Sequence, residues 1–149
     1  MDITEGLLNK YSNGLEFKLR MRCGLNNCSE MYNIYNNGDY EGLIIFRNKS
    51  YAPNGLDLSI NVTSLMLCYV DSGLGTKVMR AVCESAKEIG AEEVNVWFIQ
   101  KDKSMEETAE GKKKRLTYRK RKKAFKKIGQ KLGSKVSYDK ENNRVIYML

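Results

Sequence analysis

Gly73, Leu74 and Gly75 form a glycine-rich turn between an apolar segment, residues 64–70, and a stretch in which apolar residues recur at helical spacing. Glycines in such a turn let the backbone approach a ligand closely and leave successive N–H groups pointing outward. The N-terminus of the following helix adds about half a positive charge. The amides of residues 73–76 are therefore predicted to bind a phosphate or pyrophosphate, and the alternative is a tight turn that binds no ligand.

The turn lacks the parts that would identify a particular nucleotide site. No third glycine completes a dinucleotide fingerprint, and no Gly-Lys-Ser/Thr sequence follows as it does in a P-loop.

The chain contains no histidine. This excludes nucleophiles activated by a serine–histidine or cysteine–histidine pair and removes a common ligand of zinc sites, so no metal site is expected. Any proton transfer must use Asp, Glu, Tyr, Lys or Cys side chains or a held water.

Positive charge is concentrated near the C-terminus. Of the 26 Lys and Arg residues, 13 lie between positions 112 and 135, where no Asp or Glu occurs, and the rest of the chain has 13 basic and 18 acidic residues. Such a block indicates a polyanionic partner, such as nucleic acid or an acidic protein, or else a solvated helix face. The predicted contact residues are Arg119, Lys120, Lys122, Lys123, Lys126 and Lys127.

Periodicity predicts the elements that would position these residues. Residues 15–22 alternate between apolar and polar, and residues 40–47 and 56–70 are extended apolar segments, the latter with a bulge near 61–64. Residues 2–10, 76–89 and 112–132 are predicted helices, with Gly90 placed to end the second. Within residues 23–37, Met31, Ile34 and Tyr35 have the spacing of a short helix. A strand at 94–99 and a hairpin from residue 135 complete a mixed sheet of α+β type.

The composition predicts a single domain over residues 1–149. The sequence has no apolar run long enough to cross a membrane, and no signal-peptide core. Its four cysteines include no C-x-x-C pair, which favours a reducing compartment. We expect a cytoplasmic protein without a membrane partner, and the sequence does not indicate an oligomeric state.

Residues 69–75, Tyr-Val-Asp-Ser-Gly-Leu-Gly, with the helix and strand behind them, resemble the central motif of the GNAT superfamily of acyl-CoA-dependent N-acetyltransferases. A weaker similarity lies at residues 125–130, Phe-Lys-Lys-Ile-Gly-Gln, where the family often has a Tyr before a Gly-Phe pair. The resemblance covers residues 15–149 and implies a GNAT-like mixed, mostly antiparallel twisted sheet flanked by helices. Val70 replaces the usual Gln or Arg, and Phe125 stands where the family often keeps the Tyr that protonates the departing thiolate.

The resemblance also implies that acetyl-CoA is the cofactor. Loop amides would hold its pyrophosphate, and the end of the preceding strand would pair with its pantetheine arm. The cofactor-binding residues implied are Leu65, Leu67, Val70, Gly73, Leu74, Gly75 and Thr76.

The reaction implied is direct attack of an amine on the thioester, which needs a base for the amine and an acid for the thiolate. Asp57, Tyr118 and Tyr138 are the candidate proton carriers, each with the alternative of a purely structural role. The leading hypothesis is acetyl-CoA-dependent acetylation of an amine, such as one on a macromolecule. The alternative is a GNAT-like protein that has lost catalysis and binds nucleic acid or another polyanion through its basic helix.

Overall fold

The computed structural model describes residues 3–23, 29–47, 59–68, 73–98 and 109–149, with side chains described from residue 119 onward in the last range. The elements, in chain order, are α1 (Glu5–Lys10), β1 (Leu15–Cys23), β2 (Ser29–Asn36), β3 (Asp39–Arg47), β4 (Ser59–Leu67), α2 (Leu74–Glu88), β5 (Glu93–Trp97), α3 (Ala109–Lys131), β6 (Lys135–Asp139) and β7 (Arg144–Met148).

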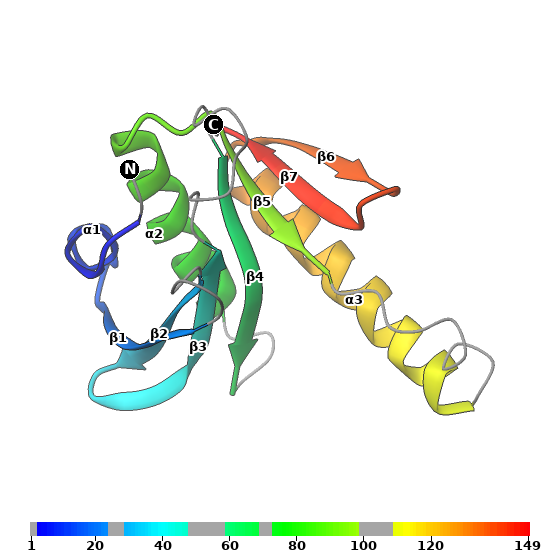
Figure 1. Cartoon of the computed structure of the whole chain (residues 1–149), viewed down its shortest axis with the longest axis horizontal. Coiled ribbons are helices and arrows are strands. Elements are labelled where there is room, and N and C mark those ends of the chain that lie inside the picture. The colour runs from blue at the N-terminus through cyan, green and yellow to red at the C-terminus, as the bar shows by residue number, and fades with distance from the viewer. Residues whose placement is uncertain (1–2, 24–28, 48–58, 69–72, 99–108) are drawn as a thin grey trace.

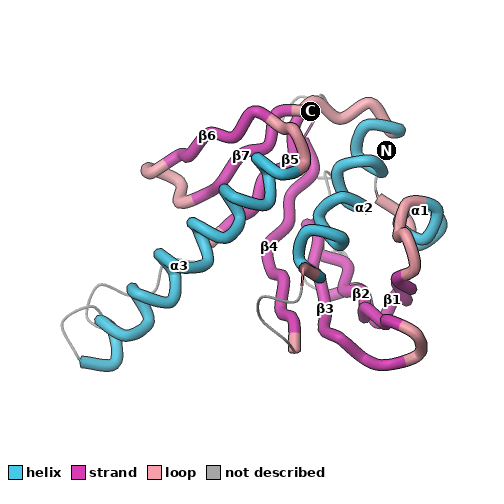
Figure 2. Tube along the Cα trace, turned by 180° about the vertical axis from the view of Figure 1, so that it is seen from behind, coloured by secondary structure: helices cyan, strands magenta, loops and turns pink. Residues whose placement is uncertain are grey.

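The seven strands in this part of the chain form one sheet in the order β1-β2-β3-β4-β5-β7-β6 (Figure 1). Only the β4–β5 pair is parallel, and the other neighbouring strands are antiparallel. Figure 2 shows α2 and α3 side by side over one face of the sheet, with α1 near β1. The predicted mixed, mostly antiparallel α+β sheet is therefore confirmed.

Local sequence signals placed α2 correctly. Its apolar face (Val78, Met79, Val82 and Ala86) is buried, and Gly90 follows the helix with a φ of 80°. The N–H of Gly90 donates to Lys87 O, and the N–H of Ala91 donates to Ala86 O at 2.9 Å. These two bonds form a Schellman motif, which requires the positive φ that glycine adopts without strain.

The short helix predicted within residues 23–37 is wrong, because β2 occupies Ser29–Asn36. Glu30, Tyr32 and Ile34 alternate along one buried face of this strand, and β2 pairs with β1 on one side and β3 on the other. The spacing of Met31, Ile34 and Tyr35 fits a helical face, but hydrogen bonds from two neighbouring strands outweighed this local pattern. Asn37 and Gly38 both have positive φ, 51° and 85°, as a two-residue type I′ hairpin requires.

The predicted bulge in the third extended segment is confirmed. Ile45 is opposite Ser64 and Phe46 is opposite Val62, so Thr63 is the extra residue of β4. A bulge bends its strand and increases the local twist.

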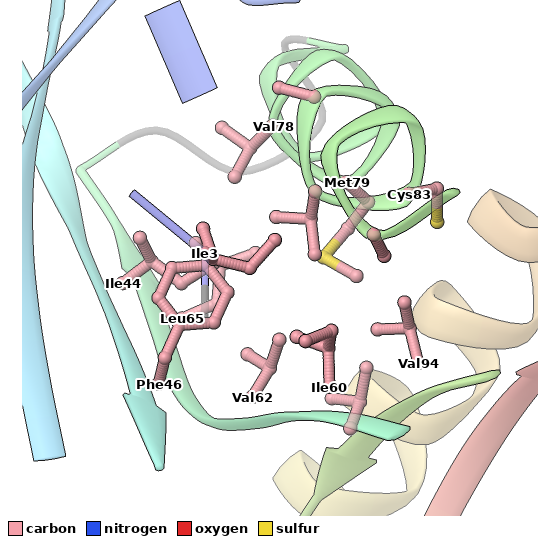
Figure 3. Close-up of a cluster of buried hydrophobic side chains, with 14 of the residues drawn as sticks. Ile3, Ile44, Phe46, Ile60, Val62, Leu65, Val78, Met79, Cys83 and Val94 are labelled. Carbon is pink, nitrogen blue, oxygen red and sulfur yellow. The ribbon is translucent and has the colours of Figure 1, made fainter. Parts of the chain in front are cut away.

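The main core lies between the sheet and α2 (Figure 3). Val78, Met79 and Cys83 of α2 lie over Ile60, Val62 and Leu65 of β4, and Ile3 inserts beside them. No helix in the described part of the chain is long and apolar enough to span a membrane.

The outer edge of β1 is covered by side chains from α1. Asn9 Nδ2 donates to Phe17 O at 2.9 Å, and Phe17 N–H donates to Asn9 Oδ1 at 2.7 Å. Leu19 N–H donates to Glu5 Oε2 at 2.8 Å. One amide side chain thus satisfies both backbone groups of Phe17, as a neighbouring strand would do.

Candidate functional site

The parallel strands β4 and β5 diverge at the centre of the sheet. They pair only from Ser59 opposite Glu93 to Val62 opposite Val96. Beyond this point β4 continues along β3 to Leu67, whereas β5 ends at Trp97, and Figure 1 shows the two strands separating. Residues 63–67 of β4 therefore have one edge, here called the open edge, that pairs with no strand in the described part of the chain.

The open edge presents the backbone groups of Leu65 and Leu67. The N–H of Cys68 donates to Glu41 O on the β3 side at 2.7 Å. Because successive residues of a strand direct their N–H and C=O groups to opposite edges, Leu65 and Leu67 direct theirs toward the open edge. These are the two strand residues that the sequence predicted to pair with a cofactor arm.

The N-terminus of α2 begins at a glycine. Gly73 is the N-cap residue with a φ of 77°, no side chain in the described part of the chain caps the helix, and its first turn contains no acidic residue. Helix geometry leaves the amides of Leu74, Gly75 and Thr76 without an intrahelical acceptor. Lys77 is exposed directly behind them. This helix end therefore attracts an anion through its dipole and a nearby cation.

Gly75 marks the point where β4, α2 and α3 meet. A Cβ at this position would lie 3.3 Å from Ile128 Cδ1 of α3 and 3.7 Å from Leu67 Cδ1 of β4. A side chain at this position would be in tight contact with the Ile128 side chain. The glycine thus brings the amides of α2 next to the open edge.

Six of the seven predicted cofactor residues are therefore brought together: Leu65, Leu67, Gly73, Leu74, Gly75 and Thr76. Leu65 and Leu74 have buried side chains, so each can offer a ligand only its backbone. Val70 lies outside the described residues.

Arg121 is a residue of this site that the sequence analysis missed. Its Nη2 donates to Leu65 O on the open edge at 3.0 Å. Its spacing of four and seven residues from Phe125 and Ile128 places it on the buried face of α3, which is the signal that could have identified it.

The predicted proton carriers are not gathered at this site. Tyr138 lies on β6, and its hydroxyl donates to Asn143 Oδ1 at 3.0 Å. The Asn143 amide in turn donates to Phe98 O at 2.8 Å, so the Tyr138 hydroxyl helps to hold the terminal hairpin. Asp57 and the side chain of Tyr118 lie outside the described residues.

Phe125 is part of the core. Its ring packs edge-to-face on Phe98 with centroids 5.7 Å apart, and its carbonyl accepts a 2.5 Å hydrogen bond from the Tyr147 hydroxyl. Burial raises the pKa of Tyr147 far above its ordinary value, so this hydroxyl keeps its proton. Phe125 has no acidic proton, and the buried Tyr147 hydroxyl does not release its own. Neither residue can therefore act as a general acid.

The cations of α3 divide into two groups. Lys122 is half-buried, with Nζ 5.2 Å from the Tyr138 ring centroid and 5.9 Å from that of Phe98. Lys126 Nζ also lies 5.1 Å from the Tyr138 centroid. The exposed residues of the predicted set are Arg119, Lys120, Lys123, Lys126 and Lys127. The first half of α3 extends beyond the edge of the sheet in both Figure 1 and Figure 2.

No protein-family model and no curated protein matches this sequence. Two solved structures match nearly the whole fold. One is a Bacillus subtilis acetyltransferase in complex with CoA, with a TM-score of 0.51, 13% identity, and coverage of 91% of this chain and 99% of that one. The other is an IAA acetyltransferase from Bacillus cereus, with a TM-score of 0.50, 12% identity and the same coverage. Campylobacter jejuni N-acetyltransferase PseH in complex with acetyl coenzyme A matches with a TM-score of 0.48 and 16% identity, covering 82% of this chain and 67% of that one.

At these identities the matches show the fold alone. The chain has the GNAT-like α+β fold, and this expectation from the sequence is confirmed.

Proposed function

We propose that this chain binds acetyl-CoA and transfers the acetyl group to an amine. One observation carries the proposal: the open edge of β4 ends beside the N-terminus of α2, which no described side chain caps, with Gly75 at the contact. An extended amide chain attached to a pyrophosphate has the two chemistries that this arrangement can bind.

The two parts of the cofactor would occupy the two parts of the site. The pyrophosphate would accept hydrogen bonds from the amides of residues 73–76, with Lys77 adding positive charge. The amides of the pantetheine arm would pair with the backbone of Leu65 and Leu67, as an added strand does. The CoA named in the B. subtilis acetyltransferase structure supports this choice of ligand.

In the proposed reaction the amine nitrogen attacks the thioester carbonyl carbon and the C–S bond breaks. The amine loses one proton and the CoA thiolate gains one. Phe125 has no ionisable proton, and the Tyr138 hydroxyl is held by Asn143, so the thiolate proton would come from Tyr118, Asp57 or a held water.

Calorimetric titration with acetyl-CoA tests the proposal, using Thr76→Glu against Thr76→Gln. Thr76 is half-buried in the first turn of α2, where Glu is favourable to the helix, so folding should be retained. We expect micromolar binding by the wild type, about tenfold weaker binding with Glu because a carboxylate repels the pyrophosphate, and near wild-type binding with Gln. A wild-type protein that binds no acetyl-CoA would overturn the proposal.

A second candidate function is binding of a polyanion, such as nucleic acid, through α3. It is favoured by the exposed side chains of Arg119, Lys120, Lys123 and Lys127 on a helix that extends beyond the sheet. Arg119, Lys123 and Lys127 are spaced by four residues and so form one cationic stripe.

This candidate predicts binding to a fluorescent oligonucleotide that weakens steeply with salt. The logarithm of the affinity should fall by about 0.9 per phosphate contact for each tenfold increase in salt. Reversing Lys120, Lys123 and Lys127 to Glu should remove most of the binding. Reversing Lys18, Lys87 and Lys140, which are exposed elsewhere, makes the same change in net charge and should have a much smaller effect. Equal losses in both triple variants would show that only net charge matters and would contradict a specific role for α3.

A further inference from the structure

Arg121 occupies a backbone acceptor that the cofactor site itself needs. The Leu65 carbonyl on the open edge accepts the Nη2–H of Arg121 at 3.0 Å. Leu65 directs its N–H and C=O groups to the same edge, so an extended ligand pairing there would use this carbonyl too. The guanidinium and the ligand therefore compete for one oxygen atom.

Arg121 makes only some of the hydrogen bonds that a neighbouring strand would make with the open edge. A guanidinium donates hydrogen bonds and accepts none, so it satisfies the Leu65 carbonyl but not the N–H groups of Leu65 and Leu67. A chain of secondary amides offers both donors and acceptors. It can therefore displace the arginine and satisfy the edge more fully.

The backbone of α3 is held in place independently of this contact. Phe125 is buried, and its carbonyl accepts a hydrogen bond from Tyr147 on β7. A Cβ at Gly129 would lie 2.5 Å from Val136 Cγ2, so α3 lies tightly against the terminal hairpin. Release of Leu65 thus requires only a rotamer change of the half-buried Arg121 side chain.

We propose that Arg121 is a latch on the acyl-CoA site, which the pantetheine arm must displace from Leu65 O in order to bind. The inference rests on the proposed function. The latch acts on ligands with an extended amide arm and does not act on a nucleotide held at the N-terminus of α2. The latch therefore lowers the affinity for the pantetheine arm and leaves the affinity for the nucleotide part unchanged.

The test is a titration of two ligands into three proteins. The ligands are CoA and adenosine 3′,5′-bisphosphate, which keeps the adenosine, its 3′-phosphate and one phosphate of the pyrophosphate but lacks the arm. The proteins are the wild type, Arg121→Met, which keeps the apolar stem and removes the donors, and Arg20→Met, which makes the same charge change at an exposed position on β1. We expect Arg121→Met to bind CoA about tenfold more tightly, as loss of a competing charge-assisted hydrogen bond allows, with bisphosphate binding unchanged. Arg20→Met should resemble the wild type with both ligands.

Each other outcome contradicts the latch in a distinguishable way. If Arg121→Met weakens binding of both ligands, Arg121 is a phosphate ligand; the latch is then wrong and the proposed function stands. Unchanged CoA affinity in that variant also rejects the latch alone. If none of the three proteins binds CoA, the proposed function fails and the latch fails with it.

A measurement on the wild-type protein covers the case in which Arg121→Met does not fold. The hydrogen bond to Leu65 restricts rotation of the guanidinium, so its NMR signals should report the closed latch. Saturating CoA should shift these signals and speed the rotation, whereas the bisphosphate should do neither. Signals that stay unchanged in saturating CoA would overturn the proposal.

Discussion

Two strand edges of this sheet meet side chains from helices, and the two contacts differ in kind. At the outer edge of β1, Asn9 donates to and accepts from the backbone of Phe17, which is fully buried. At the open edge of β4, Arg121 donates one hydrogen bond to Leu65 O and can accept none. The first contact completes the pairing of its strand residue, and the second leaves the pairing half complete.

The difference shows how the protein treats an edge that needs protection and an edge that we propose binds a ligand. An unprotected outer strand is a template for pairing with another chain. The Asn9 amide prevents such pairing by occupying the backbone groups of Phe17. A long cation is a weaker substitute for a strand, because it leaves the strand N–H groups to other partners. At the open edge of β4, Arg121 therefore occupies the Leu65 carbonyl but can be displaced by the proposed ligand.

Gly42→Ala should have the largest effect and should disrupt the β4 side of this comparison. Gly42 has a φ of 149°, and a Cβ there would lie 2.0 Å from Met66 O and 2.9 Å from Leu67 Cα. The atom meets backbone and cannot be accommodated by a rotamer change, so β3 and β4 must separate. We expect a loss of about 4 kcal/mol or more in the free energy of unfolding, measured with urea, and loss of acetyl-CoA binding.

The matched control is Gly38→Ala in the β2–β3 turn. Gly38 has a φ of 85°, and a Cβ there would meet nothing within 4 Å. The cost should therefore be only that of a left-handed backbone, about 1 kcal/mol. Similar losses in the two variants would contradict the importance of the close β3–β4 approach.

Gly129→Ala should come next, because it displaces the helix that carries the latch. The new methyl group would lie 2.5 Å from Val136 Cγ2 and 2.7 Å from Tyr147 Cε1. We expect a loss of about 2 kcal/mol in thermal or urea unfolding, with altered CoA affinity as Arg121 moves away from Leu65. Gly6→Ala in α1 is the control, since its Cβ would meet only Thr4 Oγ1 at 4.0 Å; it should be neutral or stabilise by about 0.5 kcal/mol.

Asn9→Ala tests the β1 side directly. It leaves the buried N–H and C=O of Phe17 without their partner, so unfolding should require about 2 kcal/mol less. Asn9→Asp keeps the acceptor but loses the donor, and its loss should be comparable or larger because a carboxylate would face the Phe17 carbonyl. Arg121→Met should cost less than either variant. Equal losses of unfolding free energy in Arg121→Met and Asn9→Ala would contradict the proposed difference between the β1 edge and the open edge of β4.

Glu88→Gln should give the smallest effect, which is present near neutral pH and lost in acid. Lys10 and Tyr11, at the end of α1, donate hydrogen bonds to the Glu88 carboxylate of α2, and these bonds lower the pKa of Glu88 below its ordinary value. The folded state therefore favours the carboxylate, and this contribution is complete above the ordinary pKa near 4.5 and is lost as the pH falls through the folded-state value. The Gln variant should be less stable than the wild type near neutral pH and should converge with it in acid. A gap that does not narrow as the pH is lowered below 4.5 would contradict this account.

Several elements could be predicted because their signals are local. The alternation of residues 15–22 matches β1, where Leu15 and Phe17 are buried and Glu16 and Lys18 are exposed. Gly90 predicted the end of α2, whereas the helix begins at Leu74, inside the segment predicted as the glycine turn.

The prediction for β2 failed because its signal was not local. Met31, Ile34 and Tyr35 fit a helical face, and only pairing with β1 and β3 makes the alternation of Glu30, Tyr32 and Ile34 decisive. The Asn37-Gly38 pair is a strong short signal of a hairpin and points to a strand on each side.

The sequence by itself determined the strand–glycine–helix unit, the basic block and the absence of histidine, because each depends on residues adjacent in the chain or on composition. Only the tertiary structure decided which backbone edge stays open and which side chain meets it. Leu65 and Arg121 are 56 positions apart, and Gly129 approaches Tyr147 only after α3 folds back onto the terminal hairpin. Such contacts depend on how whole elements pack against one another, and no local pattern of residue types records that packing.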